Sequence, residues 1–180
     1  MLVTLREVLK DAQEKHYGVG LFNTVNLEMA KGVLAAAEEL RSPVIIGTAE
    51  VLLPYASLEE LTYFLLPMAR KATVPVVLHY DHGLTEEKIL EALRLGFSSI
   101  MYDCSTDSYE NNIGRVAQMV KIARLFGASV EGELGHVGAN ESPTADDSIY
   151  TQPEEALDFV SRTGVDALAV AIGTAHGAYK

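Results

Sequence analysis

The sequence predicts an α/β fold built on a parallel sheet. Short apolar runs alternate along the chain with longer segments of helical periodicity. This alternation is typical of parallel sheets, because a parallel strand pair needs a crossover connection, which is usually a helix. Both a doubly wound sheet and a barrel agree with the pattern. No G-x-G-x-x-G motif follows the first expected strand, so a dinucleotide site is not supported.

The expected strands are the short apolar runs, and most of the expected helices lie between them. In chain order, the strands cover residues 18–22, 44–47, 74–78, 99–102, 128–130 and 167–172. The helices cover residues 2–16, 26–41, 57–72, 85–95, 109–126 and 153–163. Residues 135–150 form a long irregular stretch rich in Gly, Asn, Ser and Asp, and a loop of this length is typical of a lid or a binding loop.

Local signals mark where two helices begin and where one of them is expected to be interrupted. Ser57 with Glu60, and Thr151 with Glu154, have the spacing of a capping box, in which each side chain binds the backbone N–H of the other residue. Pro67 lies inside the third expected helix. It predicts a kink or an early break, because proline lacks the N–H group and crowds the preceding turn.

Composition and charge exclude several classes of partner. The chain has 180 residues, of which 48% are hydrophobic and 22% charged, as in ordinary globular proteins. Its net charge of -11 argues against nucleic acid, which requires clustered Lys and Arg. No run reaches the roughly 20 apolar residues of a membrane span, so no membrane is expected as a partner. The absence of a signal-like N-terminus and the single cysteine, Cys104, favour a cytoplasmic location.

Polar side chains gather where the expected strands end, which is where sites lie in alternating α/β folds. In chain order these residues are Asn23, Asp81, His82, Asp103, Glu133 and His176. Zn²⁺ accepts histidine nitrogen and carboxylate oxygen, and catalytic zinc keeps one open position. His82 and His176 could therefore supply two of three ligands, with Asp81 beside the metal as a proton-transfer group. Zinc as a Lewis acid together with a carboxylate base suits the enolisation of a carbonyl compound.

Two motifs carry a family resemblance. The H-x-D-H-G motif of residues 79–83 and the G-T-x-H-G-x-Y-K motif of residues 173–180 resemble those of class II, zinc-dependent ketose-bisphosphate aldolases. The resemblance implies a TIM (β/α)8-type barrel, of which about six of the eight strands are present. Residues 1–180 would then be a single, incomplete domain. It also implies an aldehyde-lyase of carbohydrate metabolism, such as glycolysis. The reaction would interconvert fructose or tagatose 1,6-bisphosphate with dihydroxyacetone phosphate and glyceraldehyde 3-phosphate through a zinc-stabilised enediolate.

The resemblance also implies catalytic and substrate-binding roles. Asp81 matches the carboxylate that exchanges a proton with the substrate C4 oxygen. Glu141 matches the acid that moves the C3 proton, and it lies in the 135–150 stretch, which is expected to be a mobile active-site loop. The expected contacts to the phosphorylated sugar are Asn23, Gly177 and Lys180.

The metal-binding roles follow from the same resemblance. His82 and His176 match zinc ligands. Asp103 and Glu133 match a second metal position or alternative ligands, so a second divalent ion or a monovalent cation stays open. His79 and Glu131 are expected to support this set rather than to bind the metal.

The resemblance is incomplete in length. The family has a third zinc histidine and a Gly/Ser phosphate loop that this sequence lacks, so a truncated chain is expected. Alone, it should be poorly soluble, should associate through open sheet edges and should show no turnover. In the family setting, a homodimer or homotetramer is expected. Two alternatives stay open, namely another metal-dependent barrel enzyme, such as a hydrolase, and an inactive truncated subunit.

Overall fold

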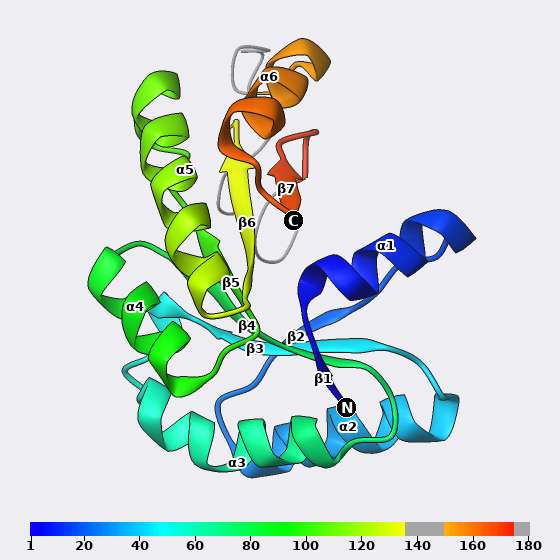
Figure 1. Cartoon of the computed structure of the whole chain (residues 1–180). Coiled ribbons are helices and arrows are strands. Elements are labelled where there is room, and N and C mark those ends of the chain that lie inside the picture. Colours follow the sequence, from blue (N-terminus) through cyan, green and yellow to red (C-terminus); the bar gives the residue numbers. More distant parts are fainter. Residues whose placement is uncertain (136–149, 175–180) are drawn as a thin grey trace.

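The computed structural model describes residues 1–135 and 150–174, and its strands form one parallel sheet. The strands are β1 (Leu2–Val3), β2 (Leu21–Asn23), β3 (Val44–Ala49), β4 (Val76–Gly83), β5 (Ser99–Tyr102), β6 (Ser129–Leu134) and β7 (Ala167–Val170). The helices are α1 (Leu5–Lys15), α2 (Leu27–Leu40), η1 (Glu50–Leu52), α3 (Leu58–Lys71), α4 (Glu86–Leu95), α5 (Tyr109–Leu125) and α6 (Pro153–Thr163). Strands β2 to β7 pair in chain order. They curl into a partial barrel, as Figure 1 shows, and this confirms the predicted fold class.

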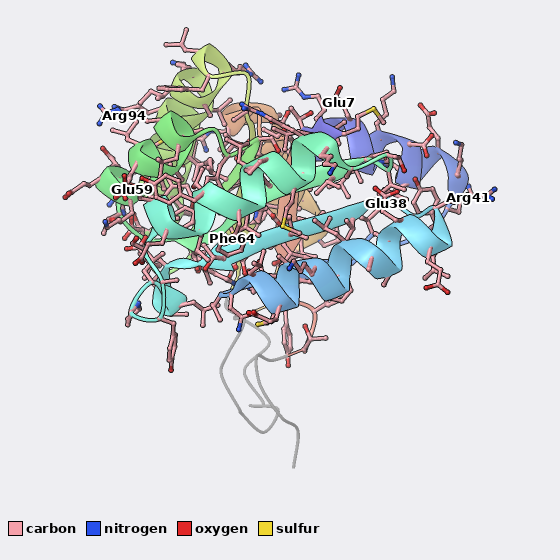
Figure 2. The ribbon with its side chains drawn as sticks, turned by 90° about the horizontal axis from the view of Figure 1, so that it is seen from below. Glu7, Glu38, Arg41, Glu59, Phe64 and Arg94 are labelled. Atoms are coloured by element: carbon pink, nitrogen blue, oxygen red, sulfur yellow. The ribbon has the colours of Figure 1, made fainter. Side chains whose placement is uncertain are left out.

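Two apolar clusters lie on opposite faces of the sheet. Ile46 of β3 belongs to the larger cluster, which includes buried side chains of helices α2 to α6. Its neighbour Ile45 packs instead with Leu5 and Val8 of α1. Because successive side chains of a strand point to opposite faces, helices α2 to α6 cover the outer face and α1 lies on the inner face. Figure 2 shows α2 and α3 side by side in the outer layer.

The N-terminal segment differs from the helix expected over residues 2–16. Leu2 and Val3 form β1, which pairs with the start of β4. The helix begins only after Thr4, whose side chain accepts a hydrogen bond from the backbone of Glu7 in a capping box. The Thr-x-x-Glu spacing was visible in the sequence. The strand pairing was not, because two residues are too few to show a periodicity.

Two further helix expectations were wrong in whole or in part. Of the kink or early break expected at Pro67, the break does not occur, because helix α3 continues through Pro67 to Lys71. Its buried face, which includes Leu61 and Leu65, packs into the outer core and offsets the lost hydrogen bond. Thr151 does not cap α6. Its hydroxyl instead donates to the backbone carbonyl of Leu134, at the end of β6.

Strands β4 and β6 extend beyond the expected ranges 74–78 and 128–130. The apolar runs end early because the inward-facing side chains near the end of each strand are polar. The backbone ladder continues nevertheless, since β4 stays in register with β3 as far as Asp81. Asp81, His82 and Glu133 therefore lie in the last residues of their strands rather than after them.

In the described part of the chain, β2 and β7 are the two end strands of the main sheet path. Leu21 and Phe22 of β2 are substantially exposed. None of the helices in residues 1–135 and 150–174 has the length and apolar character needed to cross a bilayer.

Candidate active site

The end of β4 has an irregular backbone that places two adjacent polar side chains. The register between β4 and β5 shifts between Tyr80 and Gly83, and His82 has a left-handed φ of 43°. A non-glycine residue in this conformation costs on the order of 1–2 kcal/mol, which the surrounding structure must offset. In a regular strand, Asp81 and His82 would face opposite sides. A bulge can re-aim a side chain, and here both residues contact partners at the same end of the sheet.

Gly83 allows this close packing at the strand end. A Cβ atom at this position would lie 2.8 Å from the backbone oxygen of Met101 on β5 and 2.7 Å from a side-chain carbon of Ile89. Any larger residue would push β4 away from its neighbours. The lack of a side chain at Gly83 therefore allows the irregular end of β4 to lie close to β5 and α4.

His82, Asp103 and Glu133 form a compact cluster of potential metal ligands. Each offers one ligand atom, and these atoms all lie within 4.8 Å of one another. The Nδ1 atom of His82 is 2.9 Å from a carboxylate oxygen of Asp103 and 3.9 Å from one of Glu133. The three side chains come from the ends of β4, β5 and β6, which lie beside one another in the sheet.

The charges in this cluster perturb one another in the metal-free chain. The hydrogen bond to Asp103 raises the pKa of His82 to about 9. Burial alone would raise the pKa of Asp103, but hydrogen bonds from His82 and Ser105 lower it to about 2. Burial, with a smaller contribution from Asp103, raises the pKa of Glu133 to about 7. Perturbations of this size are common at functional sites.

Ser105 and Asn112 support the cluster from outside. Both the backbone N–H and the hydroxyl of Ser105 donate to Asp103 Oδ1, at 3.0 and 2.7 Å. Asn112 is buried on α5 and donates to the backbone carbonyl of Glu133 at 2.9 Å. Sequence reasoning assigned neither residue a role, because a serine in a loop or an asparagine in a helix carries no distinctive signal alone.

A second polar group lies on the inner face around His79. This ring is fully buried, and its Nδ1 atom is 2.9 Å from the Ser99 hydroxyl. Its Nε2 atom lies 3.4 Å from Glu131 and 4.0 Å from Asp81. Burial lowers the pKa of His79 to about 4, so the ring is neutral at physiological pH. Burial, with a contribution from Asp81, raises the pKa of Glu131 to about 7.

Asp81 is also held by Asn23. The Asn23 amide donates to Asp81 Oδ2 at 2.8 Å, across from the end strand β2 to β4. The amide oxygen of Asn23 is buried and has no hydrogen-bond partner within the described residues. Such an orphaned acceptor is suited to a ligand hydroxyl or a water molecule.

The structure brings together five of the nine residues proposed from the sequence, all at the carboxyl ends of strands β2, β4, β5 and β6. They are Asn23, Asp81, His82, Asp103 and Glu133. The other four lie outside the described residues, and they are Glu141, His176, Gly177 and Lys180. The expected loop over residues 135–150 also falls almost wholly outside them.

The donor set suits a divalent metal. One imidazole and two carboxylates are ligands that zinc accepts, and three protein ligands with an open position are typical of catalytic zinc. The raised pKa of Glu133 indicates carboxylates crowded into a buried space, which a cation would relieve. His82, Asp103 and Glu133 therefore form a possible metal site.

Comparison with known proteins gives several extensive similarities. The fructose-bisphosphate aldolase of Thermus caldophilus is 46% identical over 183 residues, which cover 100% of this chain and 60% of that protein. The probable fructose-bisphosphate aldolase of Bacillus subtilis is 42% identical over 192 residues, covering 99% of this chain and 64% of that protein. The crystal structure of the YdjI aldolase from Escherichia coli K12 has a TM-score of 0.89 at 43% identity, covering 98% of this chain and 64% of that chain.

The match to the family profile is similarly extensive. The profile described as fructose-bisphosphate aldolase class-II matches residues 3–180. The chain spans 60–64% of the length of the three relatives above. The matched region contains the partial barrel and the cluster at its carboxyl end. On the strength of this match, the chain belongs to the class II fructose-bisphosphate aldolase family.

Proposed function

We propose that the protein containing this chain is a zinc-dependent aldolase. It would interconvert a ketose 1,6-bisphosphate, of the fructose or tagatose type, with dihydroxyacetone phosphate and glyceraldehyde 3-phosphate. The observation that carries the proposal is the proximity of His82, Asp103 and Glu133, with the Asp81 carboxylate next to His82 on β4. Family membership supports an aldol reaction on a phosphorylated sugar.

The proposed metal ligands are His82 and His176, with Asp103 and Glu133 as further or alternative ligands. A bound zinc ion would polarise the substrate carbonyl and stabilise negative charge on oxygen. Asp103 also accepts the hydrogen bond from His82 and so directs the imidazole. This orientation prepares the site before the metal arrives.

Asp81 is the proposed base for cleavage. It would remove the proton from the substrate C4 hydroxyl as the C3–C4 bond breaks, and it would return that proton in the condensation direction. The hydrogen bond from Asn23 to Oδ2 helps to fix the carboxylate, and lone pairs that accept no protein hydrogen bond can take the proton. Glu141 would exchange the C3 proton, and Gly177 and Lys180 would contact the triose-phosphate half, with Lys180 near its phosphate.

The decisive experiment measures metal-dependent cleavage by the complete gene product that contains these residues. Release of dihydroxyacetone phosphate from fructose or tagatose 1,6-bisphosphate should stop on addition of a chelator and return with Zn²⁺. The Asp81→Asn variant, which keeps the side-chain size but removes the base, should lose nearly all turnover. Glu59→Gln, at an exposed position of α3, serves as the control. Release of inorganic phosphate without triose phosphates would identify a hydrolase instead.

We also propose a cytoplasmic location, a single domain and assembly into a homodimer or homotetramer. The single cysteine supports the first of these proposals. Leu21 and Phe22 are exposed apolar side chains on the end strand β2. They support the proposed assembly, because further protein packed on this end of the sheet would cover them. Light scattering on the purified gene product would measure the oligomeric state directly.

A further inference from the structure

We propose that His79 is a positioning residue for Asp81. Ser99 would fix the His79 ring so that its Nε2–H group points between Glu131 and Asp81 and limits the rotation of the Asp81 carboxylate. This inference rests on the proposed role of Asp81 as the base. It assigns a specific task to a residue expected from the sequence only to support the site.

The first observation is an orphaned polar atom on a fully buried side chain. His79 is 0% exposed, and its Nε2 atom has no hydrogen-bond partner within the described residues. Buried polar atoms are almost always paired, so an exception indicates a functional constraint or a partner that arrives later. The carboxylate oxygens of Glu131 and Asp81, at 3.4 and 4.0 Å, are the acceptors that a small rotation would bring into range.

The second observation concerns which ring nitrogen carries the proton. A neutral imidazole has one N–H donor and one acceptor nitrogen. If the proton were on Nδ1, the lone pair of Nε2 would face the carboxylates of Glu131 and Asp81, which is electrostatically unfavourable. If Ser99 donates its hydroxyl proton to Nδ1, at 2.9 Å, then Nε2 carries the proton and faces two acceptors. The surroundings therefore favour the Nε2–H tautomer.

The third observation is that the backbone beneath His79 is held tightly. Gly47 of β3 lies opposite His79 in the sheet register. A Cβ atom at Gly47 would lie 2.1 Å from the His79 carbonyl oxygen, so only glycine permits this approach. The close approach of Gly47 thus holds the backbone of His79, and Ser99 holds its ring. A rigid support of this kind can define the direction of a neighbouring side chain.

Asp81 is then held from two sides. Asn23 donates to its Oδ2 atom at 2.8 Å, and its Oδ1 atom is the one that faces His79. With one donor, the carboxylate can still pivot about that hydrogen bond. A second donor would remove this freedom, and a misplacement of about 1 Å at a reacting group can cost on the order of 100-fold in rate.

Two substitutions at His79 distinguish the role of Nε2 from that of Nδ1. In His79→Gln, the amide nitrogen can occupy the place of Nε2 and still donate toward Asp81. In His79→Asn, a polar atom stays near Ser99, but nothing reaches the position of Nε2. We expect His79→Asn to lower kcat by about 10–100-fold, with KM and bound zinc unchanged, and His79→Gln to restore most of that loss. Ser99→Ala, which only releases the ring, should give a smaller loss of kcat.

These kinetic measurements use the complete gene product, with bound zinc determined for each variant. Equal losses in His79→Asn and His79→Gln would refute the positioning role, as would a loss explained by missing zinc. If the unsubstituted protein cleaves no ketose bisphosphate, the proposed function itself fails.

Nitrogen-15 NMR of the histidine rings gives a readout that does not depend on activity. The His79 signals are assigned as those missing in His79→Gln. We expect an acceptor shift for Nδ1 and a protonated shift for Nε2, with the Nδ1 signal moving in Ser99→Ala. A proton on Nδ1 would overturn the inference even in a fully active enzyme. If the His79 variants fail to fold, the signal that moves in Ser99→Ala assigns the ring.

Discussion

The Nδ1 atom of His82 lies 2.9 Å from a carboxylate oxygen of Asp103, and this contact joins the ends of two neighbouring strands. Asp103 is in turn held by Ser105 through two hydrogen bonds. The imidazole is therefore oriented by the protein alone, before any metal binds. Glu133 completes the set from the next strand. This geometry leads to predictions about metal affinity, pH dependence and stability that can be tested separately from turnover.

Replacing Asp103 by Asn should weaken zinc binding. The substitution removes a negative charge and the acceptor that directs His82, so we expect zinc affinity to fall by about 10–100-fold. Competition with a chromophoric chelator measures the change. Asp107→Asn is the matched control, because Asp107 pairs with Arg115 and is not part of the ligand cluster. Equal zinc affinity in Asp103→Asn and the unsubstituted chain would contradict a ligand or orienting role.

The stability of the metal-free chain should fall as pH rises from 6.5 to 9. The folded-state pKa of His82 is raised from 6.5 to about 9, so its pairing with Asp103 is fully present below pH 6.5 and lost as pH rises through 9. The depressed pKa of Asp103, about 2, keeps its charge throughout this range. The raised pKa of Glu133, about 7, acts in the same direction but mainly between pH 4.5 and 7, so the change above pH 7 comes chiefly from His82. The loss between pH 6.5 and 9 is on the order of 1–3 kcal/mol.

Urea unfolding of the metal-free chain at pH 6.5 and pH 9 measures this loss, with His82→Gln as the control that should reduce it. Zinc should act in the opposite direction. It requires neutral His82, so binding releases a proton, and affinity rises with pH up to about 9. The stabilisation by zinc should therefore be larger at pH 9 than at pH 6.5. Identical pH dependence with and without zinc would argue against His82 as a ligand.

Much of the fold followed from the sequence because hydrophobic periodicity is a local property. The helices and strands expected from residue 18 onward all exist, most of them with shifted ends. The largest shifts are in β4 and β6, and they have one cause. Near the end of β4 the inward-facing residues become His79 and Asp81, so the apolar pattern stops while the backbone pairing continues. The apolar pattern therefore underestimated the strand at the residues where the polar side chains of the site begin.

The site was predictable in its residue types but not in its contacts. Motif resemblance identified Asp81, His82 and Glu133, because their identity and spacing are distinctive. The partners Ser99 and Asn112 were missed, since a serine in a strand or an asparagine in a helix carries no distinctive signal alone. The left-handed backbone of His82 was also invisible, because it depends on how β4 and β5 shift register.

Replacing Glu133 by Gln should stabilise the metal-free chain and weaken metal binding at the same time. The Glu133 side chain is nearly buried, and its ionised form is disfavoured by burial and by the charge of Asp103. Gln keeps the size and removes the charge, so the free energy of unfolding without metal should rise by on the order of 1–2 kcal/mol at pH 8. Zinc affinity should fall, because a carboxylate ligand is lost.

Thermal unfolding with and without zinc tests both effects of Glu133→Gln in one experiment. The control is Glu131→Gln, which removes a partly buried carboxylate whose pKa is also raised to about 7 and which is not in the ligand cluster. It should also stabilise the metal-free chain but leave zinc affinity nearly unchanged. If both variants weaken zinc binding equally, the ligand cluster is not confined to His82, Asp103 and Glu133.

Replacing Gly47 by Ala should destabilise the fold and disturb the site above it. An added Cβ would lie 2.1 Å from the backbone oxygen of His79, and neither backbone can move aside without breaking the pairing of β3 with β4. Overpacking of a core typically costs about 1–3 kcal/mol, and a clash with backbone should fall at the upper end or beyond. Gly32→Ala is the matched control, since a Cβ there would meet nothing within 4 Å. In helix α2 that change should instead stabilise the chain by roughly 0.5–1 kcal/mol. Opposite shifts in the denaturation midpoint would show that the cost at Gly47 comes from the contact with His79 rather than from the loss of glycine itself.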